Sequence, residues 1–339
     1  MSLLQQAPRF DLAGAARLAH ELYGLDASAS HLPSERDQNF LLTTATGDRY
    51  VLKVANAAEN RAMLEAQNAA MEHVAGRAEL CPRVVPTLVG ETIVTASGRA
   101  LVRVVTYLAG TPLAEAGART PALLESLGRA VGRLDAALAD FDHPGIHRDF
   151  HWDLANAARV IGEYLPLVRD DGDCQLVQRV SASALQGVEP HRTAFRRSAV
   201  HHDANDWNVL VSTGNREVVG IIDFGDMVFS WTVADPAVAI AYGVLDAENP
   251  LAAAAAIVRG YHAEHPLRDE ELAAVFPLAC LRLCMSACIA ARQQQQRPDD
   301  EYLAVSQEPI RRTLPALAAI PLHIAERTLR AACELRDRT

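Results

Sequence analysis

The sequence predicts an α+β protein of two lobes, a small one built on antiparallel strands and a larger one that is mainly helical. The chain has 339 residues, more than one domain usually holds. Alternating apolar patterns concentrate before residue 108, whereas helical patterns dominate after residue 113. We therefore expect an N-terminal lobe at 1–108, a hinge at about 105–112 and a C-terminal lobe at 113–339.

The N-terminal lobe is expected to combine strands with one helix. Residues 40–55, FLLTTATGDRYVLKVA, predict a hairpin that turns at Thr46–Gly47–Asp48. Residues 83–113 alternate again around Ser97–Gly98, which adds further antiparallel strands. Between these segments, apolar residues at helical spacing predict a helix that ends before Gly76; they are Met63, Ala66, Ala70 and Val74.

The C-terminal lobe starts with the helical pattern of residues 121–141 and carries one interruption. Residues 208–212, NVLVS, and 217–223, EVVGIID, are short β-branched runs separated by the turn signal Thr213–Gly214–Asn215. Two small strands inside a helical lobe usually position a functional group. We expect the chemistry of the protein beside this hairpin.

Composition restricts the classes of partner. The net charge of −10 and the pI near 5.6 argue against binding to a nucleic-acid backbone, because duplex binding needs a basic face. The longest apolar candidate for a membrane span, around residues 251–262, is too short. The segment MSLLQQAPRF lacks the basic and apolar regions of a secretory signal. We expect a cytoplasmic protein with no nucleic-acid or membrane partner.

Six cysteines are too few in a chain of this length for a disulfide scaffold. Cys280, Cys284 and Cys288 recur every four residues, so a helix would align them on one stripe. A zinc site would need a fourth ligand, and the sequence has no CxxC or HxxxH pair nearby. We expect these thiols to be buried as small apolar groups.

Two segments compete for a catalytic aspartate. The letters IHRDF contain the start of the protein-kinase catalytic loop, H-R-D-x-x-x-x-N. Five residues after Asp149, however, stands Leu154, which cannot bind a metal. In HHDANDWN, Asn208 follows Asp203 at the spacing of that loop. We therefore assign the hydroxyl-orienting role to Asp203 rather than to Asp149.

A second carboxylate supports this assignment. Asp223 lies twenty residues beyond Asp203 and heads the letters DFG at the end of the second short strand. A carboxylate there can return to the catalytic loop. Together with Asn208 it can hold Mg²⁺, which prefers oxygen ligands.

The first lobe offers a cation for nucleotide phosphates. Lys53 lies in YVLKV, which is similar to the kinase strand V-A-I-K whose lysine contacts the α- and β-phosphates. A solvated strand lysine is the plain alternative. Glu65 in the following helix is the preferred partner of this ammonium, and Glu59 is its rival. The apolar neighbours of Glu65 place it on the part of the helix expected to pack on the sheet.

The chain resembles the aminoglycoside phosphotransferase and choline kinase superfamily in four segments: YVLKV, LEAQN, HHDANDWNVLV and IIDFGD. Within that superfamily it is similar to the hydroxylysine kinase and homoserine-kinase-like branch, which includes kinase domains that bacteria fuse to class III aminotransferases. The segments SERDQNF, HWDLANA and DFGDMVFSWTVADPAVAIAY carry this closer resemblance. It spans nearly the whole chain and implies a bilobal, protein-kinase-like fold.

The resemblance also implies roles for the matched residues. Asp203 would orient the substrate hydroxyl, and Asn208 and Asp223 would hold magnesium. Position 202 departs from the superfamily, because His202 stands where many members have glycine. The acidic and amide groups of the loop are unaffected by this change.

On the nucleotide side, the resemblance implies that Lys53 contacts the phosphates of ATP or GTP with Glu65 behind it. The segment Val105 to Leu108, including Tyr107, would be the hinge beside the nucleobase. The loop at 33–40, PSERDQNF, has no glycine where protein kinases have G-x-G-x-x-G, so its phosphate contacts are left open.

The substrate side is expected to include Asp226, Trp152 and Asp153, because they lie in segments similar to the substrate segments of this branch. A carboxylate and an indole face suit a cationic amine. Two alternatives remain: the tryptophan packs in the core, and Asp153 caps the helix that begins with LANAARVIGEYL.

The resulting hypothesis is a small-molecule kinase that phosphorylates a hydroxyl of an amino acid or amino alcohol, with hydroxylysine favoured. Homoserine, choline, ethanolamine and an aminoglycoside are alternative acceptors. A non-catalytic nucleotide-binding protein and a regulatory partner of an aminotransferase are the alternatives from other classes. The intact set Lys53, Asp203, Asn208 and Asp223 favours the enzyme. The sequence gives no oligomeric state.

Overall fold

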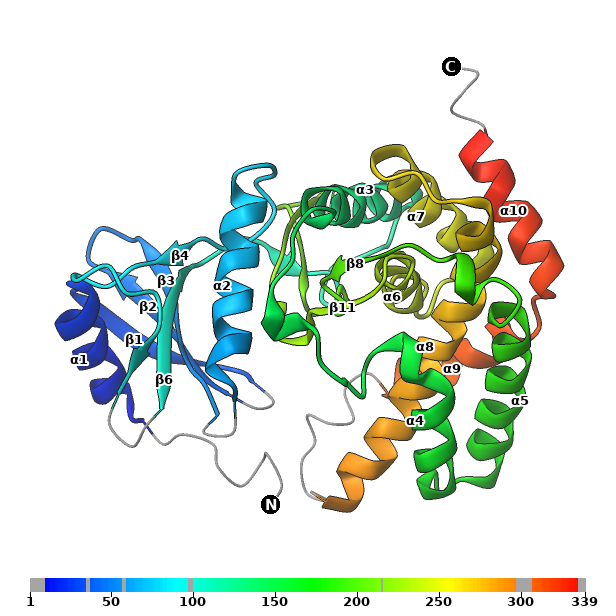
Figure 1. The fold of residues 1–339 in the computed structure, drawn as a ribbon, viewed down its shortest axis with the longest axis horizontal. Helices are drawn as coiled ribbons and strands as arrows, with labels where there is room; N and C mark the ends of the chain where they lie inside the picture. The colour runs from blue at the N-terminus through cyan, green and yellow to red at the C-terminus, as the bar shows by residue number, and fades with distance from the viewer. Residues whose placement is uncertain are drawn as a thin grey trace. The chain divides into compact units, whose positions relative to one another are not determined.

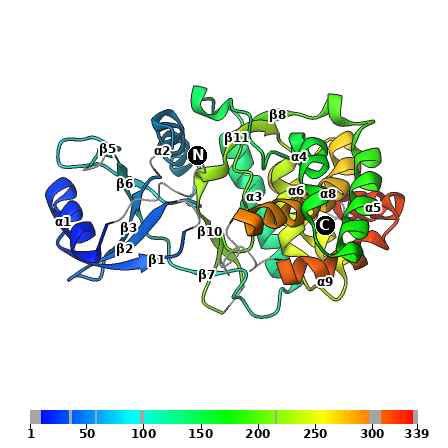
Figure 2. The same cartoon turned by 90° about the horizontal axis from the view of Figure 1, so that it is seen from below.

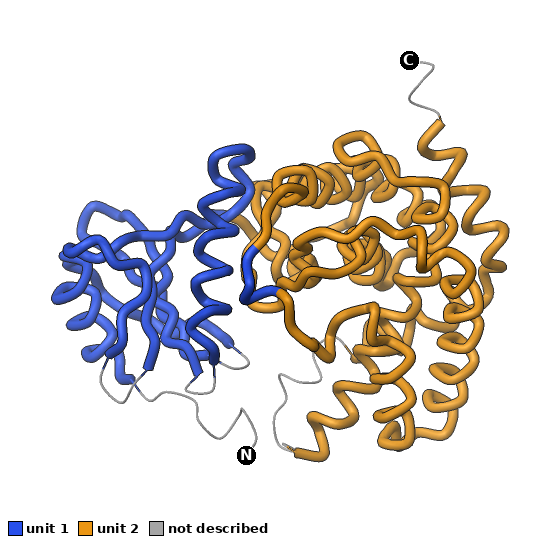
Figure 3. The backbone as a smooth tube through the Cα atoms, in the orientation of Figure 1, with its two compact units in different colours: residues 1–109, 143–146 blue, residues 110–142, 147–339 orange. Residues whose placement is uncertain are grey.

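The computed structural model divides into two compact units: residues 1–109 with 143–146, and residues 110–142 with 147–339 (Figure 3). The chain passes from the first unit to the second between Ala109 and Gly110, inside the predicted hinge at 105–112. The short return of 143–146 to the first unit was not predicted. The structure describes residues 10–34, 37–56, 59–96, 100–214, 216–296 and 307–334.

The first unit is built on an antiparallel sheet with the strand order β1-β2-β3-β6-β4, in which β5 also pairs with β6 (Figure 1). The predicted hairpin is confirmed: β2 and β3 pair from Gln38↔Val54 to Thr43↔Arg49, and Gly47 in the turn has a φ of 89°. The predicted Ser97–Gly98 turn lies outside the described residues. The strands are β1 (Ala27–Leu32), β2 (Gln38–Thr44), β3 (Arg49–Val54), β4 (Val84–Val85), β5 (Val94–Thr95) and β6 (Leu101–Thr106).

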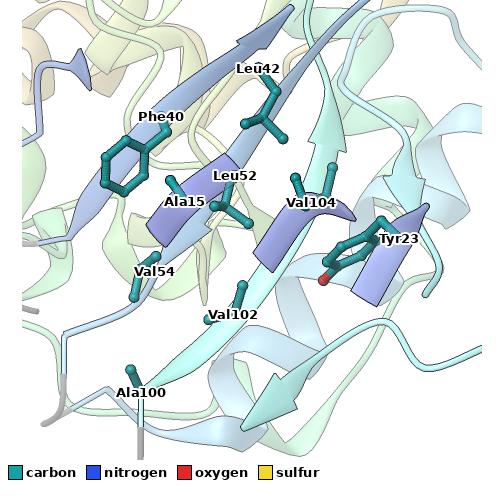
Figure 4. Packing of buried hydrophobic residues seen from close by; sticks show 10 residues of the cluster. Ala15, Tyr23, Phe40, Leu42, Leu52, Val54, Ala100, Val102 and Val104 are labelled. Atoms are coloured by element: carbon teal, nitrogen blue, oxygen red, sulfur yellow. The ribbon is translucent and has the colours of Figure 1, made fainter. Parts of the chain in front are cut away.

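Helix α1 (Leu12–Tyr23) covers one face of this sheet (Figure 1). Asp11 caps its N-terminus, and Gly24 ends it in the left-handed conformation at a φ of 66°. Its buried face meets the apolar side of the strands (Figure 4). Side chains alternate along a strand, so burying Leu52 and Val54 turns Lys53 to the opposite face. The cluster consists of Ala15, Ala19, Tyr23, Phe40, Leu42, Leu52, Val54, Ala100, Val102 and Val104.

Helix α2 (Arg61–Ala75) covers the other face, and the helix predicted to end before Gly76 is confirmed. Arg103 of β6 is buried and donates to Asn68 Oδ1 at 2.8 Å and to Gln67 Oε1. The return segment η3 (Pro144–Ile146) packs on α2. A Cβ at Gly145 would lie 2.4 Å from the Ala62 carbonyl oxygen, so this contact needs glycine.

The second unit is mainly helical, as predicted, and α8 is its central element. Helix α8 packs against α4, α5, α6, α9 and α10. Helices α3 and α7 cross with their backbones in contact, because Gly128 and Gly260 have no side chain at the crossing. The helices are α3 (Pro121–Leu138), α4 (Ala157–Tyr164), α5 (Asp171–Val188), α6 (Ala234–Gly243), α7 (Pro250–Glu264), α8 (Asp269–Gln296), α9 (Gln307–Ala318) and α10 (Leu322–Glu334).

Helix α8 corrects the expectation that no apolar segment reaches the length of a membrane span. Its most apolar 18 residues have a mean hydropathy of 2.0, but 89% of them are buried inside the fold. A buried core helix has these same properties.

Helix α8 carries Cys280, Cys284 and Cys288, which are buried as expected. Burial raises the pKa of the Cys280 and Cys288 thiols to about 12, so both stay protonated.

Two small sheets interrupt the helices of the second unit. The predicted hairpin is confirmed: β9 (Val209–Val211) pairs antiparallel with β10 (Val218–Ile221). A third strand, β7 (Thr111–Pro112), also pairs with β9. The pair of β8 (Arg197–Val200) and β11 (Val228–Trp231) was not predicted (Figure 2). Both pairs position the segments between β8 and β9 and between β10 and β11.

Candidate active site

The loop that carries Asp203 begins where β8 ends, and a buried carboxylate from another helix holds its backbone. Asp235 in α6 accepts the N–H of His201 at 2.8 Å and the N–H of His202 at 2.6 Å. The second contact fixes His202 at a φ of 66°, a left-handed conformation that is uncommon for a residue with a Cβ. Such conformations concentrate at functional sites, where the surrounding contacts impose them.

The ring of His202 is fully buried, and Leu154 N–H donates to its Nε2 at 3.0 Å. Burial lowers the pKa of His202, with the charge of Asp153 acting in the opposite direction. His202 therefore does two things. It adopts the glycine-like backbone, and it ties the Asp203 loop to the segment that contains Asp153.

Asp203 sits in a network of amide and guanidinium donors. Its Oδ1 accepts from Asn205 Nδ2 at 2.9 Å and from Arg282 Nη2 at 3.0 Å. Its Oδ2 accepts from Asn208 Nδ2 at 2.6 Å. Because the Asn208 amide nitrogen donates to Asp203, the Asn208 amide oxygen is left as an acceptor for a cation. This is the geometry expected of a D-x-x-x-x-N loop.

The DFG segment lies beside that loop, as the sequence predicted. Ile222 N–H donates to the Asn208 carbonyl oxygen at 2.9 Å. Asp223 has a φ of 65°, and its Oδ1 accepts from Gly225 N–H at 3.1 Å at the start of η7 (Phe224–Asp226). The Phe224 ring packs edge-on against the His201 ring, with centroids 4.8 Å apart. The segments that carry the two predicted metal ligands are therefore joined by a backbone hydrogen bond and by an edge-to-face ring contact.

The carboxylates of this region create a strong local negative field. Burial raises the pKa of Asp203 well above its usual value, the charges of Asp226 and Asp223 raise it further, and Arg282 opposes them. A divalent cation would relieve this repulsion. The donor set also suits Mg²⁺, because Asn208 and Asp223 present hard oxygen atoms. Among the described residues no three His, Cys, Asp or Glu side chains form a metal cluster, and Mg²⁺ typically uses few protein ligands plus substrate phosphates.

The competing HRD letters have a structural role in this region. Arg148 Nη2 donates to the carbonyl oxygens of Gly225 at 2.8 Å and of Met227 at 3.0 Å, and its guanidinium lies 4.1 Å from the centre of the Phe150 ring. Arg148 therefore stabilises the turn that contains the DFG residues. Asp149 points away from it: its side chain is 78% exposed and pairs with Arg159 at 2.9 Å.

The predicted substrate residues differ in their surroundings. Asp153 is buried, caps η4 (Leu154–Asn156) through Ala155 N–H, and accepts from Ser230 Oγ at 2.6 Å. The alternative role of Asp153 as a helix cap is thus confirmed. The Trp152 ring has the Arg282 guanidinium 4.6 Å from its centre, so a protein cation already occupies it. Asp226 is buried in η7. A substrate role for these three residues stays a prediction.

The predicted nucleotide residues belong to the first unit. Val105 is buried in β6, opposite Val51 and Val84. Tyr107 donates its N–H to the Arg49 carbonyl oxygen at 3.1 Å, and the Arg49 guanidinium lies 4.2 Å from its ring centre. Their contact with a nucleobase stays a prediction.

Glu65 does not lie on the packed side of α2, which was the reason for preferring it over Glu59. Its side chain is 47% exposed and pairs with Arg61 at 3.4 Å, whereas its neighbours Leu64 and Ala66 are buried. Neighbours in sequence point to different faces of a helix, so apolar neighbours do not imply burial. The pair of Glu65 with Lys53 stays a prediction. The loop at 33–40 lies partly outside the described residues.

Three further residues support the Asp203 loop and were not predicted: Asp235, Arg282 and Arg119. Arg119 Nη2 donates to Asp206 Oδ2 at 2.7 Å and Arg119 also donates to the Tyr242 carbonyl oxygen. The signal for Arg282 was present in the sequence, because it is the lone charge in residues 278–291 and a buried charge needs a partner. Asp235 and Arg119 carry no comparable local signal.

Comparison with known proteins agrees with this geometry. Residues 29–272 match the phosphotransferase enzyme family APH. Hydroxylysine kinase of Danio rerio is 30% identical, with 90% of this chain and 91% of that protein covered. Hydroxylysine kinase of Xenopus laevis is 32% identical, with 86% and 85% covered.

A solved structure shares the fold. The amicoumacin kinase hAmiN, in complex with AMP-PNP, Ca²⁺ and Ami, superposes with a TM-score of 0.70 at 16% identity and covers 93% of this chain and 97% of its own. The α+β kinase-like fold expected from the sequence is therefore confirmed. The enzyme class is confirmed as well: a phosphotransferase that acts on a hydroxyl group. The chain belongs to the phosphotransferase enzyme family.

Proposed function

We propose that this protein is a kinase that transfers the γ-phosphate of a nucleoside triphosphate to the hydroxyl of an amino acid or amino alcohol, with hydroxylysine as the favoured acceptor. One observation carries the proposal: Asp203 is oriented by Asn208 at 2.6 Å, and Asn208 is joined to the DFG segment through Ile222. The relatives named hydroxylysine kinase, which match over most of their length, support the acceptor.

In this proposal Asp203, Asn208 and Asp223 of the second unit have separate roles. Asp203 accepts a hydrogen bond from the acceptor hydroxyl and orients its oxygen toward the γ-phosphate. Asn208 Oδ1 and the Asp223 carboxylate hold Mg²⁺. When bound, Mg²⁺ neutralises charge on the nucleotide phosphates. Phosphoryl transfer needs positioning and charge stabilisation more than covalent help, and these residue types supply both.

Lys53 is proposed to contact the phosphates. Its strand holds it on the face of the first-unit sheet opposite the α1 core, where Arg103 already anchors α2. ATP and GTP are both candidate donors, since the choice depends on the backbone of residues 105–108. Competition between the two nucleotides in a binding titration decides it.

Asp226 is the proposed partner of the substrate ammonium group, because it is a buried carboxylate in the turn that follows Asp223 and its charge acts on Asp203. Asp226→Asn should then raise KM for an amine-bearing acceptor by about tenfold while KM for the nucleotide changes little. Equal changes in the KM values for the acceptor and for the nucleotide would instead indicate that Asp226 helps to bind the metal.

The test is nucleoside diphosphate release with Mg²⁺ and ATP or GTP across hydroxylysine, homoserine, choline, ethanolamine and kanamycin. Asp203→Asn is the control. We expect hydroxylysine to stimulate release most strongly, and the stimulation to vanish in the variant. Nucleotide binding without turnover on any acceptor would instead favour a non-catalytic protein. Co-purification with an aminotransferase would then point to the regulatory alternative.

A further inference from the structure

Arg282 carries a full positive charge in the interior of the apolar helix α8. Its residue is 1% exposed, and residues of the same helix around it are buried apolar groups. Removing a guanidinium from water costs several kcal/mol, so such a residue persists only with good partners. The partners of Arg282 identify what the charge is for.

The partners of Arg282 are Asp203, Trp152 and Tyr242. Arg282 Nη2 donates to Asp203 Oδ1 at 3.0 Å, and Nη1 donates to the Trp152 carbonyl oxygen at 3.2 Å. The guanidinium lies 4.6 Å from the centre of the Trp152 ring and 5.8 Å from that of Tyr242. Its guanidinium is therefore held by hydrogen bonds at two nitrogens and lies near two aromatic rings, which a flexible lysine would not reproduce.

This arrangement controls which oxygen of Asp203 is free. A carboxylate offers about four lone-pair positions, two on each oxygen. Arg282 and Asn205 both donate to Oδ1, whereas only Asn208 donates to Oδ2. The remaining acceptor position is therefore on Oδ2, next to the amide of Asn208. An acceptor hydroxyl that binds there lies beside the predicted metal ligand.

We propose that Arg282 is a positioning residue for phosphoryl transfer: it fixes the Asp203 carboxylate so that Oδ2 receives the acceptor hydroxyl. This inference rests on the proposed kinase function. It assigns a role to a residue on α8, an element far along the chain from the catalytic loop and outside the segments that carry the kinase motifs.

The test compares Arg282→Met and Arg282→Lys in the full chain. Arg282→Met keeps the apolar stem but leaves Asp203 Oδ1 with one donor, so the carboxylate can rotate. Displacing a reacting group by about 1 Å can lower a rate about 10²-fold. We expect kcat to fall by about that factor, while KM for the acceptor and the Kd for Mg-nucleotide stay within about threefold. Arg282→Lys should recover part of kcat, because an ammonium restores one hydrogen bond.

Arg196→Met is the matched control for lost packing. Arg196 precedes β8 and pairs with Glu271 of α8 at 2.6 Å. Its side chain therefore binds the same helix without pairing with Asp203. Loss of this ion pair should lower Tm without a selective loss of kcat. Thermal unfolding of every variant separates folding from turnover, and if Arg282→Met does not fold, Arg282→Lys decides alone.

Two results would overturn the inference. One is a kcat within threefold of the parent protein in the folded Arg282 variants. The other is a loss of kcat that Arg196→Met reproduces. A double variant of Arg282→Met with Asp203→Asn should be no slower than Asp203→Asn alone, since the arginine acts through the carboxylate. If Asp203→Asn itself retains turnover, the proposed function is wrong. If Asp203→Asn loses turnover but the Arg282 variants do not, only the role of Arg282 is wrong.

Discussion

The segments IHRDF at 146–150 and HHDANDWN at 201–208 share a histidine and an aspartate in similar order, yet the fold treats their aspartates in opposite ways. The Asp149 side chain is 78% exposed and binds surface partners. The Asp203 side chain is 18% exposed and accepts hydrogen bonds from two amides and a buried guanidinium. The comparison teaches that the surroundings of an aspartate in the fold, more than the residues that precede it in the sequence, distinguish a candidate catalytic residue.

The largest effect is expected from Asp203→Asn. The amide keeps the shape of the side chain but cannot accept the hydroxyl proton, so kcat should fall by about 10³-fold or more. Binding of Mg-nucleotide should largely survive, because Asn208 and Asp223 remain. Steady-state kinetics and calorimetric nucleotide titration measure the two quantities. Turnover within tenfold of the parent would remove Asp203 from the mechanism.

Arg148→Met should have the next largest effect and tests the structural role of the HRD letters. The arginine holds the carbonyl oxygens of Gly225 and Met227, so its loss should loosen the turn that carries Asp223. We expect an increase of about tenfold in the Mg²⁺ concentration needed for half-maximal activity, because second-shell changes of this kind cost about 10–100-fold in metal affinity.

The matched control for Arg148→Met is Arg159→Met, which removes the surface partner of Asp149. It should leave the magnesium dependence unchanged. If activity depended on Mg²⁺ concentration in the same way in Arg148→Met and in the parent protein, the hydrogen bonds of Arg148 to Gly225 and Met227 would not support the metal ligands.

His202 offers a smaller, pH-dependent effect. Burial lowers the pKa of its imidazole in the folded protein, so below about pH 6.5 the unfolded chain binds more protons than the folded one. The stability contributed by neutral His202 is present above that pH and is lost as pH falls, by at most about 1.4 kcal/mol per pH unit. His202→Asn tolerates the φ of 66° and cannot titrate.

Denaturant unfolding of the parent and His202→Asn proteins between pH 8 and pH 5 measures this effect. The free-energy difference between them should shift in favour of the variant as pH falls. A difference that is constant over the range would mean that His202 does not change its proton affinity on folding.

Much of the fold was predictable because it depends on local patterns. The hairpin around Gly47 and the helix ending before Gly76 follow from turn residues and from apolar periodicity. The pair of β8 with β11 was missed because its strands are four residues each and lie about thirty residues apart in the chain. Pairing across such a distance leaves no local signature.

The candidate site shows the same division. Asp203, Asn208 and Asp223 could be proposed from the sequence because they follow the spacing of a catalytic loop and a DFG segment along one stretch of chain. Asp235 and Arg119 were missed because their importance comes from contacts with residues far away in sequence. Glu65 was chosen for its apolar neighbours, but helix geometry turns it to the exposed side of α2. Sequence spacing therefore identifies candidate catalytic groups more readily than it identifies the residues that contact and support them.

The smallest effect is expected from Asp149→Asn, and it is the most direct check on the comparison. The exchange replaces an exposed carboxylate whose partners are Arg159 and Asn156, and surface ion pairs of this kind contribute about 0–1 kcal/mol. Arg148, the neighbouring residue, keeps both of its carbonyl contacts. Turnover should stay well within tenfold of the parent, and Tm should change by no more than a few degrees. If Asp149→Asn instead lost activity as completely as Asp203→Asn while remaining folded, the assignment of the two segments would be reversed, because an aspartate without buried donors would then be carrying the chemistry.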